Sequence, residues 1–113
     1  MESILTTVKK ACNVVEEYDA FDDVLIMYTN SVFFTLTQLG IGPPKGFAIE
    51  SEDEEWSQFL SEDEEYAAAI PTYVGSKVRL MFDPPSNSTL LNALKQTVDE
   101  FEWRLNVAAE NKQ

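Results

Sequence analysis

The chain has 113 residues, 44% of them hydrophobic and 12% aromatic, which indicates one folded domain over residues 1–113 and excludes a disordered chain. Twenty Asp and Glu against eight Lys and Arg give a formal net charge of −12, so tight binding to nucleic acid or to anionic lipid is disfavoured by repulsion. With no histidine and a single cysteine, Cys12, the chain lacks the usual general base and the usual zinc or iron–sulfur ligands, so we expect neither an enzyme nor a cofactor.

The first predicted helix covers residues 3–14. Ile4, Leu5 and Val8 recur at helical spacing, and Ser3 is placed to cap the helix start. Cys12 lies among these apolar positions, so we expect it to be a small buried hydrophobic residue. The opening residues lack the pattern of a secretory signal, and no stretch approaches the ~20 apolar residues of a membrane span, so we expect a soluble protein made in the cytoplasm.

A second helix is predicted over residues 21–39. Asp19 or Asp22 can cap its start, and the run of glycine and proline at residues 40–44 stops it. The segment is apolar nearly all round, which is typical of a helix at the centre of a core or covered on both sides. Residues 32–36 would also fit a strand, but the length of the apolar segment favours a helix.

The acidic middle of the chain contains a short sequence repeat: Ser-Glu-Asp-Glu-Glu occurs at residues 51–55 and again, ten residues later, at residues 61–65. Each copy matches a capping box and predicts helix starts for segments 52–60 and 62–82. We expect Trp56 and Phe59 to pack on the core. The carboxylates could in principle bind calcium or magnesium, but the stretch lacks the central glycine and the alternating ligands of a calcium loop. A solvated, helix-capping face is the favoured interpretation.

The fourth predicted helix contains Pro71, which predicts a kink or a restart near Ala69. The sequence Asp83-Pro84-Pro85 ends the helix, because a proline disfavours helical geometry in the residue before it. Its inward positions are apolar or aromatic and comprise Tyr66, Ile70, Tyr73, Val74, Val78 and Met81.

The last helix begins at Ser86 or Ser88 and carries an apolar seam with spacings of three and four, made by Leu91, Leu94, Val98, Phe101, Leu105 and Ala108. Such a seam is most often a core face of its own domain. Trp103 and Arg104 beside it are residue types enriched where protein surfaces meet, and they favour a partner surface as well. We therefore predict an all-α domain of about four to five helices with a long C-terminal helix.

Three segments of the chain resemble the head–tail connector, or adaptor, proteins of long-tailed bacteriophages. They are Asn30-Ser-Val-Phe-Phe-Thr-Leu-Thr-Gln-Leu-Gly-Ile-Gly-Pro43 with Gly46-Phe47, then Lys77-Val-Arg-Leu-Met-Phe-Asp-Pro-Pro85, and Phe101-Glu-Trp-Arg-Leu-Asn-Val-Ala-Ala109. The resemblance implies a helical virion protein without catalytic residues, made in the bacterial host cytoplasm and placed at the neck of the virion. It implies a homo-oligomeric ring, usually a dodecamer, that joins the portal protein to a downstream tail or stopper protein while DNA passes through.

Carried onto this chain, the resemblance gives two groups of expected contact residues. The expected portal-binding or partner-binding residues lie on the last helix and are Phe101, Trp103, Arg104, Leu105, Val107 and Ala108. The expected residues between subunits or facing the channel are Glu52, Asp53, Glu54, Glu55, Asp83, Pro84 and Pro85. The strong negative charge suits a channel through which DNA slides without sticking.

A second hypothesis comes from the charge alone. A monomeric acidic regulator that mimics DNA would bind a basic partner protein tightly and in a salt-sensitive manner. The carboxylates of this chain concentrate near residues 50–65 and are not spaced along an extended face, which favours the connector.

Overall fold

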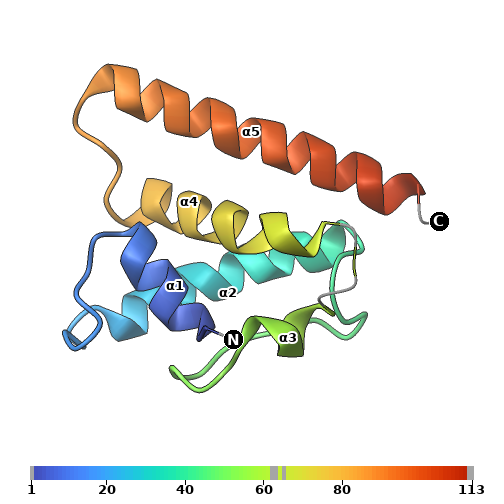
Figure 1. Ribbon diagram of the computed structural model, residues 1–113, viewed down its shortest axis with the longest axis horizontal. Coiled ribbons are helices and arrows are strands. Elements are labelled where there is room, and N and C mark those ends of the chain that lie inside the picture. Colours follow the sequence, from blue (N-terminus) through green and yellow to red (C-terminus); the bar gives the residue numbers. More distant parts are fainter. Residues whose placement is uncertain (1, 62–63, 65, 112–113) are drawn as a thin grey trace.

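The computed structural model describes residues 2–61, 64 and 66–111 (Figure 1). The helices are α1 (Ile4–Ala11), α2 (Asp22–Gln38), α3 (Trp56–Phe59), α4 (Ile70–Phe82) and α5 (Ser88–Asn111), and a 3₁₀ turn at Ala67–Ala69 leads into α4. In these ranges there is no β-strand, although Ser3 and Glu55 form one isolated antiparallel bridge. The predicted all-α fold with a long C-terminal helix is confirmed.

Helix α4 is the centre of the fold. It packs against α1 and α2 on one side and against α5 on the other (Figure 1). Tyr73, Val74 and Val78 are fully buried along it. The prediction that α2 would be covered on both sides is wrong for the isolated subunit, because Met27 and Phe34 on its outer face are 61% and 64% exposed.

Helix α1 begins as predicted and ends earlier than predicted. Ser3 caps the start, where its Oγ accepts a hydrogen bond of 3.3 Å from the amide of Thr6. The helix ends at Ala11 because Asn13 adopts a left-handed conformation with φ of 60°. The amide of Val14 then donates to the carbonyl of Lys9 at 2.8 Å, which closes a Schellman motif.

The cap of α2 differs from the predicted one, whereas α5 begins at Ser88 as predicted. Phe21 occupies the N-cap of α2 without a side-chain hydrogen bond, and Asp22 in the first turn instead pairs with the buried Nζ of Lys9 at 2.8 Å. Asn87 caps α5, where its Oδ1 accepts hydrogen bonds from the amides of Thr89 and Leu90 at 2.8 and 3.2 Å. A short amide side chain reaches these two amides as well as a serine hydroxyl does.

The first copy of the acidic repeat, residues 51–55, forms a turn instead of the predicted helix start. The capping box lies four residues later, where the amide of Glu55 donates to Oε1 of Gln58 at 2.6 Å and α3 begins at Trp56. Trp56 and Phe59 are buried as predicted. The second predicted capping box pairs Ser61 with Glu64. The amide of Glu64 donates to the backbone carbonyl of Ser61 at 3.1 Å, and α4 begins only at Ile70, so the predicted helix start at residue 62 is not the start of α4. Residues 62, 63 and 65 themselves lie outside the described residues.

The break predicted at Pro71 is confirmed in position. The 3₁₀ turn ends at Ala69, and α4 begins at Ile70 with Pro71 in its first turn, where the missing amide hydrogen is not needed. Helix α4 ends at Phe82, directly before Asp83 and the two prolines, also as predicted. Met81 was predicted to face inward, but it is 38% exposed.

The segment between α2 and α3 is held to the core by one amide side chain and by ring contacts. Asn30 accepts from the amide of Ile49 at 2.8 Å and donates to its carbonyl at 3.0 Å, so one side chain satisfies both backbone groups. The ring of Phe33 lies with its centroid 4.7 Å from that of Phe59. Gly42 has φ of +88°, and a Cβ there would lie 2.4 Å from the ring of Phe59, so only glycine fits this close approach.

Cys12 is buried as expected. Burial raises the pKa of its thiol to about 11, so the thiolate that reacts with electrophiles is scarce at neutral pH. The cysteine therefore acts as a small apolar residue under α4.

Helices α1 and α4 cross at a contact that leaves no space for a side chain on Gly75. A Cβ built on Gly75 lies 2.9 Å from the Cβ of Ala11, which is fixed to the α1 backbone and cannot rotate away. Val8 on α1 and Tyr73 on α4 are both fully buried.

We expect the effect of Gly75→Ala to reverse sign with the residue at position 11. In the wild-type background the overpacking costs about 1–3 kcal/mol, which exceeds the gain in helix propensity of about 1 kcal/mol. In an Ala11→Gly background the clash is absent, so Gly75→Ala should raise the free energy of unfolding. Urea denaturation of the four proteins in this double-mutant cycle measures the coupling. Equal effects in both backgrounds would show that the two helices do not meet at these residues.

Candidate functional site

The expected partner-binding residues all lie on α5, and the structure divides them into three groups by their exposure. Trp103 is 66% exposed and Arg104 is exposed, with its Nη2 2.9 Å from Oε1 of Glu100 one turn earlier. Leu105 is buried at 2% exposure, so its side chain belongs to the core of the subunit and supports the exposed face of the helix only from beneath. Phe101, Val107 and Ala108 are half-buried between these extremes.

Helix α5 touches the rest of the subunit along a narrow line. Val98, Leu105 and Ala109 are its buried side chains within the described part of the helix, and Leu90 near its start is 60% exposed. The seam predicted from spacing is therefore only partly covered, since Leu91 and Leu94 are half-buried. Much of this long helix remains open to a partner.

Three side chains, Tyr73, Lys77 and Glu102, join α4 to α5 beside the exposed face, and we call them the polar clasp. The hydroxyl of Tyr73 donates a 2.8 Å hydrogen bond to Oε2 of Glu102, and Nζ of Lys77 lies 3.5 Å from the same oxygen. Burial and, after it, the hydrogen bond to this carboxylate raise the pKa of Tyr73 well above its ordinary value. The clasp sets the rotation of α5 and with it the direction in which Trp103 points.

The second group of expected residues lies in two loops that the fold keeps apart. Residues 52–55 precede α3, whereas residues 83–85 join α4 to α5 at a different edge of the subunit (Figure 1). The exposed members are Glu52, Asp53, Glu55, Asp83 and Pro84, and the half-buried members are Glu54 and Pro85. A single subunit therefore presents these residues as two separate surfaces.

In the loop of residues 52–55, the side chain of Glu54 stabilises the backbone turn. Its carboxylate accepts hydrogen bonds from the amides of Glu50 at 2.9 Å and Ser51 at 3.2 Å. Partial desolvation acts to raise the pKa of Glu54, but these amides outweigh it and hold the pKa below its ordinary value. Glu54 thus shapes the turn that presents its neighbours Glu52 and Asp53 to solvent.

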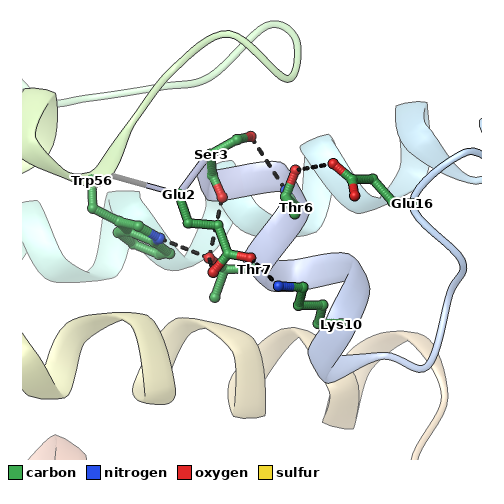
Figure 2. A network of polar contacts seen from close by, with 7 residues as sticks. All are labelled: Glu2, Ser3, Thr6, Thr7, Lys10, Glu16 and Trp56. Carbon is green, nitrogen blue, oxygen red and sulfur yellow. Dashed lines mark hydrogen bonds and ion pairs between the residues drawn. The ribbon is translucent and has the colours of Figure 1, made fainter.

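A network of polar side chains joins the N-terminus to α3 (Figure 2). The indole Nε1 of Trp56 donates to Oγ1 of Thr7 at 3.0 Å, and Thr7 lies 3.1 Å from a carboxylate oxygen of Glu2. The hydrogen bond from Lys10 is the main cause that lowers the pKa of Glu2. Next to this network lies a mainly apolar pocket of about 360 Å³, lined by Glu2, Thr7, Trp56, Phe59, Leu60, Ala67, Ala68, Ile70 and Pro71.

The sequence reasoning missed several exposed apolar side chains outside α5. Met27 and Phe34 lie two turns apart on α2, and Val15, Tyr18 and Phe21 lie in or next to the loop that precedes it. The absence of lysine and arginine between residues 11 and 44 could have drawn attention to this region. Exposure itself could not have been read from the sequence, because apolar residues usually indicate burial.

No group of three or more acidic or cysteine side chains able to hold a metal ion occurs among the described residues. In the same part of the chain, no helix is both long enough and apolar enough to cross a bilayer.

A family model described as phage connector protein matches residues 4–112, nearly the whole chain. The chain belongs to the phage connector protein family. Neither a comparison with curated proteins nor one with solved structures gives a significant match. The resemblance noted in the sequence is thus confirmed, and membership supports a connector role together with association with other virion proteins.

For this connector we expect Tyr73→Phe to lower the free energy of unfolding by about 1–2 kcal/mol at pH 7, because a hydrogen bond to a partly exposed carboxylate is lost. The unfolded tyrosine releases its proton near pH 10, whereas the folded one retains it, so this contribution declines as the pH rises above about 10. Urea denaturation of both proteins between pH 7 and 11 measures the difference. A gap that widens with pH would contradict the assigned hydrogen bond.

Proposed function

We propose that the chain is a structural head–tail connector that assembles into a ring beneath the portal protein, at the neck of the virion, and joins the capsid to the tail. The observation that carries this proposal is the family match over residues 4–112. The fold supports it, because the outermost helix presents an exposed tryptophan and an incompletely covered apolar seam. Within this proposal the chain has no catalytic role and no cofactor.

Ring formation requires two different surfaces on each subunit, since a head-to-tail interface joins unlike patches. The subunit presents exposed apolar side chains on α5, at Leu90, and on α2, at Met27 and Phe34. Helix α4 lies between these two helices (Figure 1). This arrangement is suited to a closed ring, for which the resemblance to head–tail connectors gives about twelve copies as the usual number.

The α5 face is the proposed contact with the portal protein. Trp103 offers a large apolar surface, and Arg104, held by Glu100, offers a planar cation beside it. Exposed tryptophan and arginine are the residue types that contribute most to binding energy at interfaces. Leu105 does not contact the portal protein in this proposal. Its buried side chain instead holds α5 on the core of the subunit.

The acidic loops are the proposed surfaces between subunits or toward the channel. Glu52, Asp53 and Glu55 in one loop and Asp83 in the other are exposed. Carboxylates that face a channel repel the phosphate backbone, so DNA can pass without being held. The downstream face of the ring would meet the tail or stopper protein.

Substitutions on α5 should separate assembly from stability. We expect Trp103→Ala to weaken assembly with the portal protein at least about tenfold while leaving the helical circular dichroism signal unchanged, because this side chain is exposed. Leu105→Ala should instead cost about 2–5 kcal/mol of subunit stability, since it removes a buried side chain. Asn106→Ala, an exposed change on the same helix, is the control. Native mass spectrometry with purified portal protein measures assembly.

Assembly with the portal protein that persists unchanged with Trp103→Ala would show that this face of α5 is not the portal contact. A wild-type monomer that ignores the portal protein and instead binds a basic nucleic-acid-binding protein in a salt-sensitive manner would favour the acidic regulator.

A further inference from the structure

The connection between α1 and α2 exposes an apolar patch, which consists of Val15, Tyr18 and Phe21. These side chains are 65%, 51% and 40% exposed. They border an open hollow of about 540 Å³, which Asn13, Val14 and Glu17 complete. In Figure 1 this connection lies at the left edge of the subunit, near the end of α4. None of these residues belongs to the surfaces assigned above to the ring or to the portal.

The patch is held in place by the fold. The ring of Phe21 meets the ring of Tyr18 at a centroid distance of 5.4 Å and the ring of Phe82, at the end of α4, at 5.1 Å. The buried Nζ of Lys9 donates to the carbonyl of Glu16 at 2.8 Å, which fixes the middle of the connection. A surface that is ordered before binding loses less entropy when a partner docks.

Carboxylates surround the patch, and the two lysines near it, Lys9 and Lys10, act on Asp22 and Glu16. Glu16, Glu17, Asp19 and Asp23 are exposed, and the chain has neither lysine nor arginine between residues 11 and 44. Asp22 differs from these four, because Lys9 neutralises it. The result is an apolar centre with an acidic rim.

We propose that this patch binds a protein segment that presents an aromatic or aliphatic anchor flanked by lysine and arginine. Apolar side chains at the centre of an interface supply affinity, and complementary charges around them supply orientation and a fast association rate. The same rim repels DNA and anionic lipid. A second copy of this chain fits poorly, because the chain has only eight lysine and arginine residues against twenty acidic ones, and Lys9 and Lys77 already pair with carboxylates within the subunit.

The proposed patch depends on the proposed connector function in one respect, the identity of its partner. If the chain is a connector, that partner is another protein of the virion neck. The probes are therefore the purified portal protein and the purified tail protein that follows the connector, each titrated against the full-length chain at low and high salt. We expect one of them to bind, and Val15→Ser and Tyr18→Ser each to weaken its binding at least about tenfold. The pair Glu17→Gln with Asp19→Asn should weaken binding at low salt and reduce its salt dependence.

Met81→Ser is the matched control, because Met81 is exposed to 38% on α4 and belongs neither to the patch nor to the surfaces assigned to the ring or the portal. Phe21 is left unchanged, since it packs on Phe82. Binding that neither Val15→Ser nor Tyr18→Ser weakens would overturn the patch proposal and leave the connector function standing. Loss of self-association in these variants, with unchanged binding of both probes, would make the occupant a second copy and would also overturn it. If neither probe binds the wild-type chain, both proposals fail.

Discussion

The fold depends on the burial of one helix of 13 residues, α4. Helix α4 is buried from several sides at once, because α1 and α2 pack on one flank and α5 packs on the other. The crossing with α1 requires a glycine at position 75, and the crossing with α5 uses the hydroxyl of Tyr73, whose ring is fully buried. In a chain of this size the core is small, so each of these contacts contributes a substantial part of the net stability.

This construction leaves the other long helices incompletely covered. Helix α5 meets the subunit through a narrow line of small and aliphatic side chains, while Trp103 faces solvent. Helix α2 likewise exposes Met27 and Phe34. A subunit that buries one central helix and leaves large apolar residues on two outer ones is suited to assembly, since further burial is available only between subunits or with other proteins. That property agrees with membership in the phage connector family.

The charged residues also fall into two sets, those that form ion pairs within the subunit and those that face solvent. Lysine and arginine are few, and several are used inside the subunit: Lys9 ties α1 to the start of α2, and Lys77 joins the clasp between α4 and α5. Carboxylates such as Glu17, Asp19, Glu52 and Asp53 are exposed, and the chain has twenty acidic residues against eight basic ones, so the surface is strongly negative. Such a surface is suited to a protein that stays near DNA without binding it, and it favours partners that carry basic segments.

Local chemistry predicted much of the fold. Apolar periodicity located the helices, Ser3 marked the start of α1, and Pro71 and the pair at residues 84 and 85 marked a restart and a stop. The caps made by Asn87 and the stop at Asn13 were missed, because several short polar residues nearby compete for these positions and only the folded backbone decides among them.

The central position of α4 and the exposed residues of α2 could not have been predicted from periodicity. The position of α4 depends on which helix approaches Gly75, a contact between segments more than sixty residues apart. For the candidate site, the spacing on α5 identified Leu105 and Trp103 together, but only the three-dimensional packing separates a core residue from an exposed one. The portal contact and the channel-facing loops remain predictions.

The central claim is that the folded subunit joins the portal through the outer face of α5. Electron cryomicroscopy of the chain bound to the portal protein of the same phage tests it most directly. The account predicts a ring of this subunit on the portal, with α4 still covered by α1, α2 and α5 and with Trp103 buried at the contact. A complex in which Trp103 faces solvent, or the absence of any ring on the portal, would contradict it.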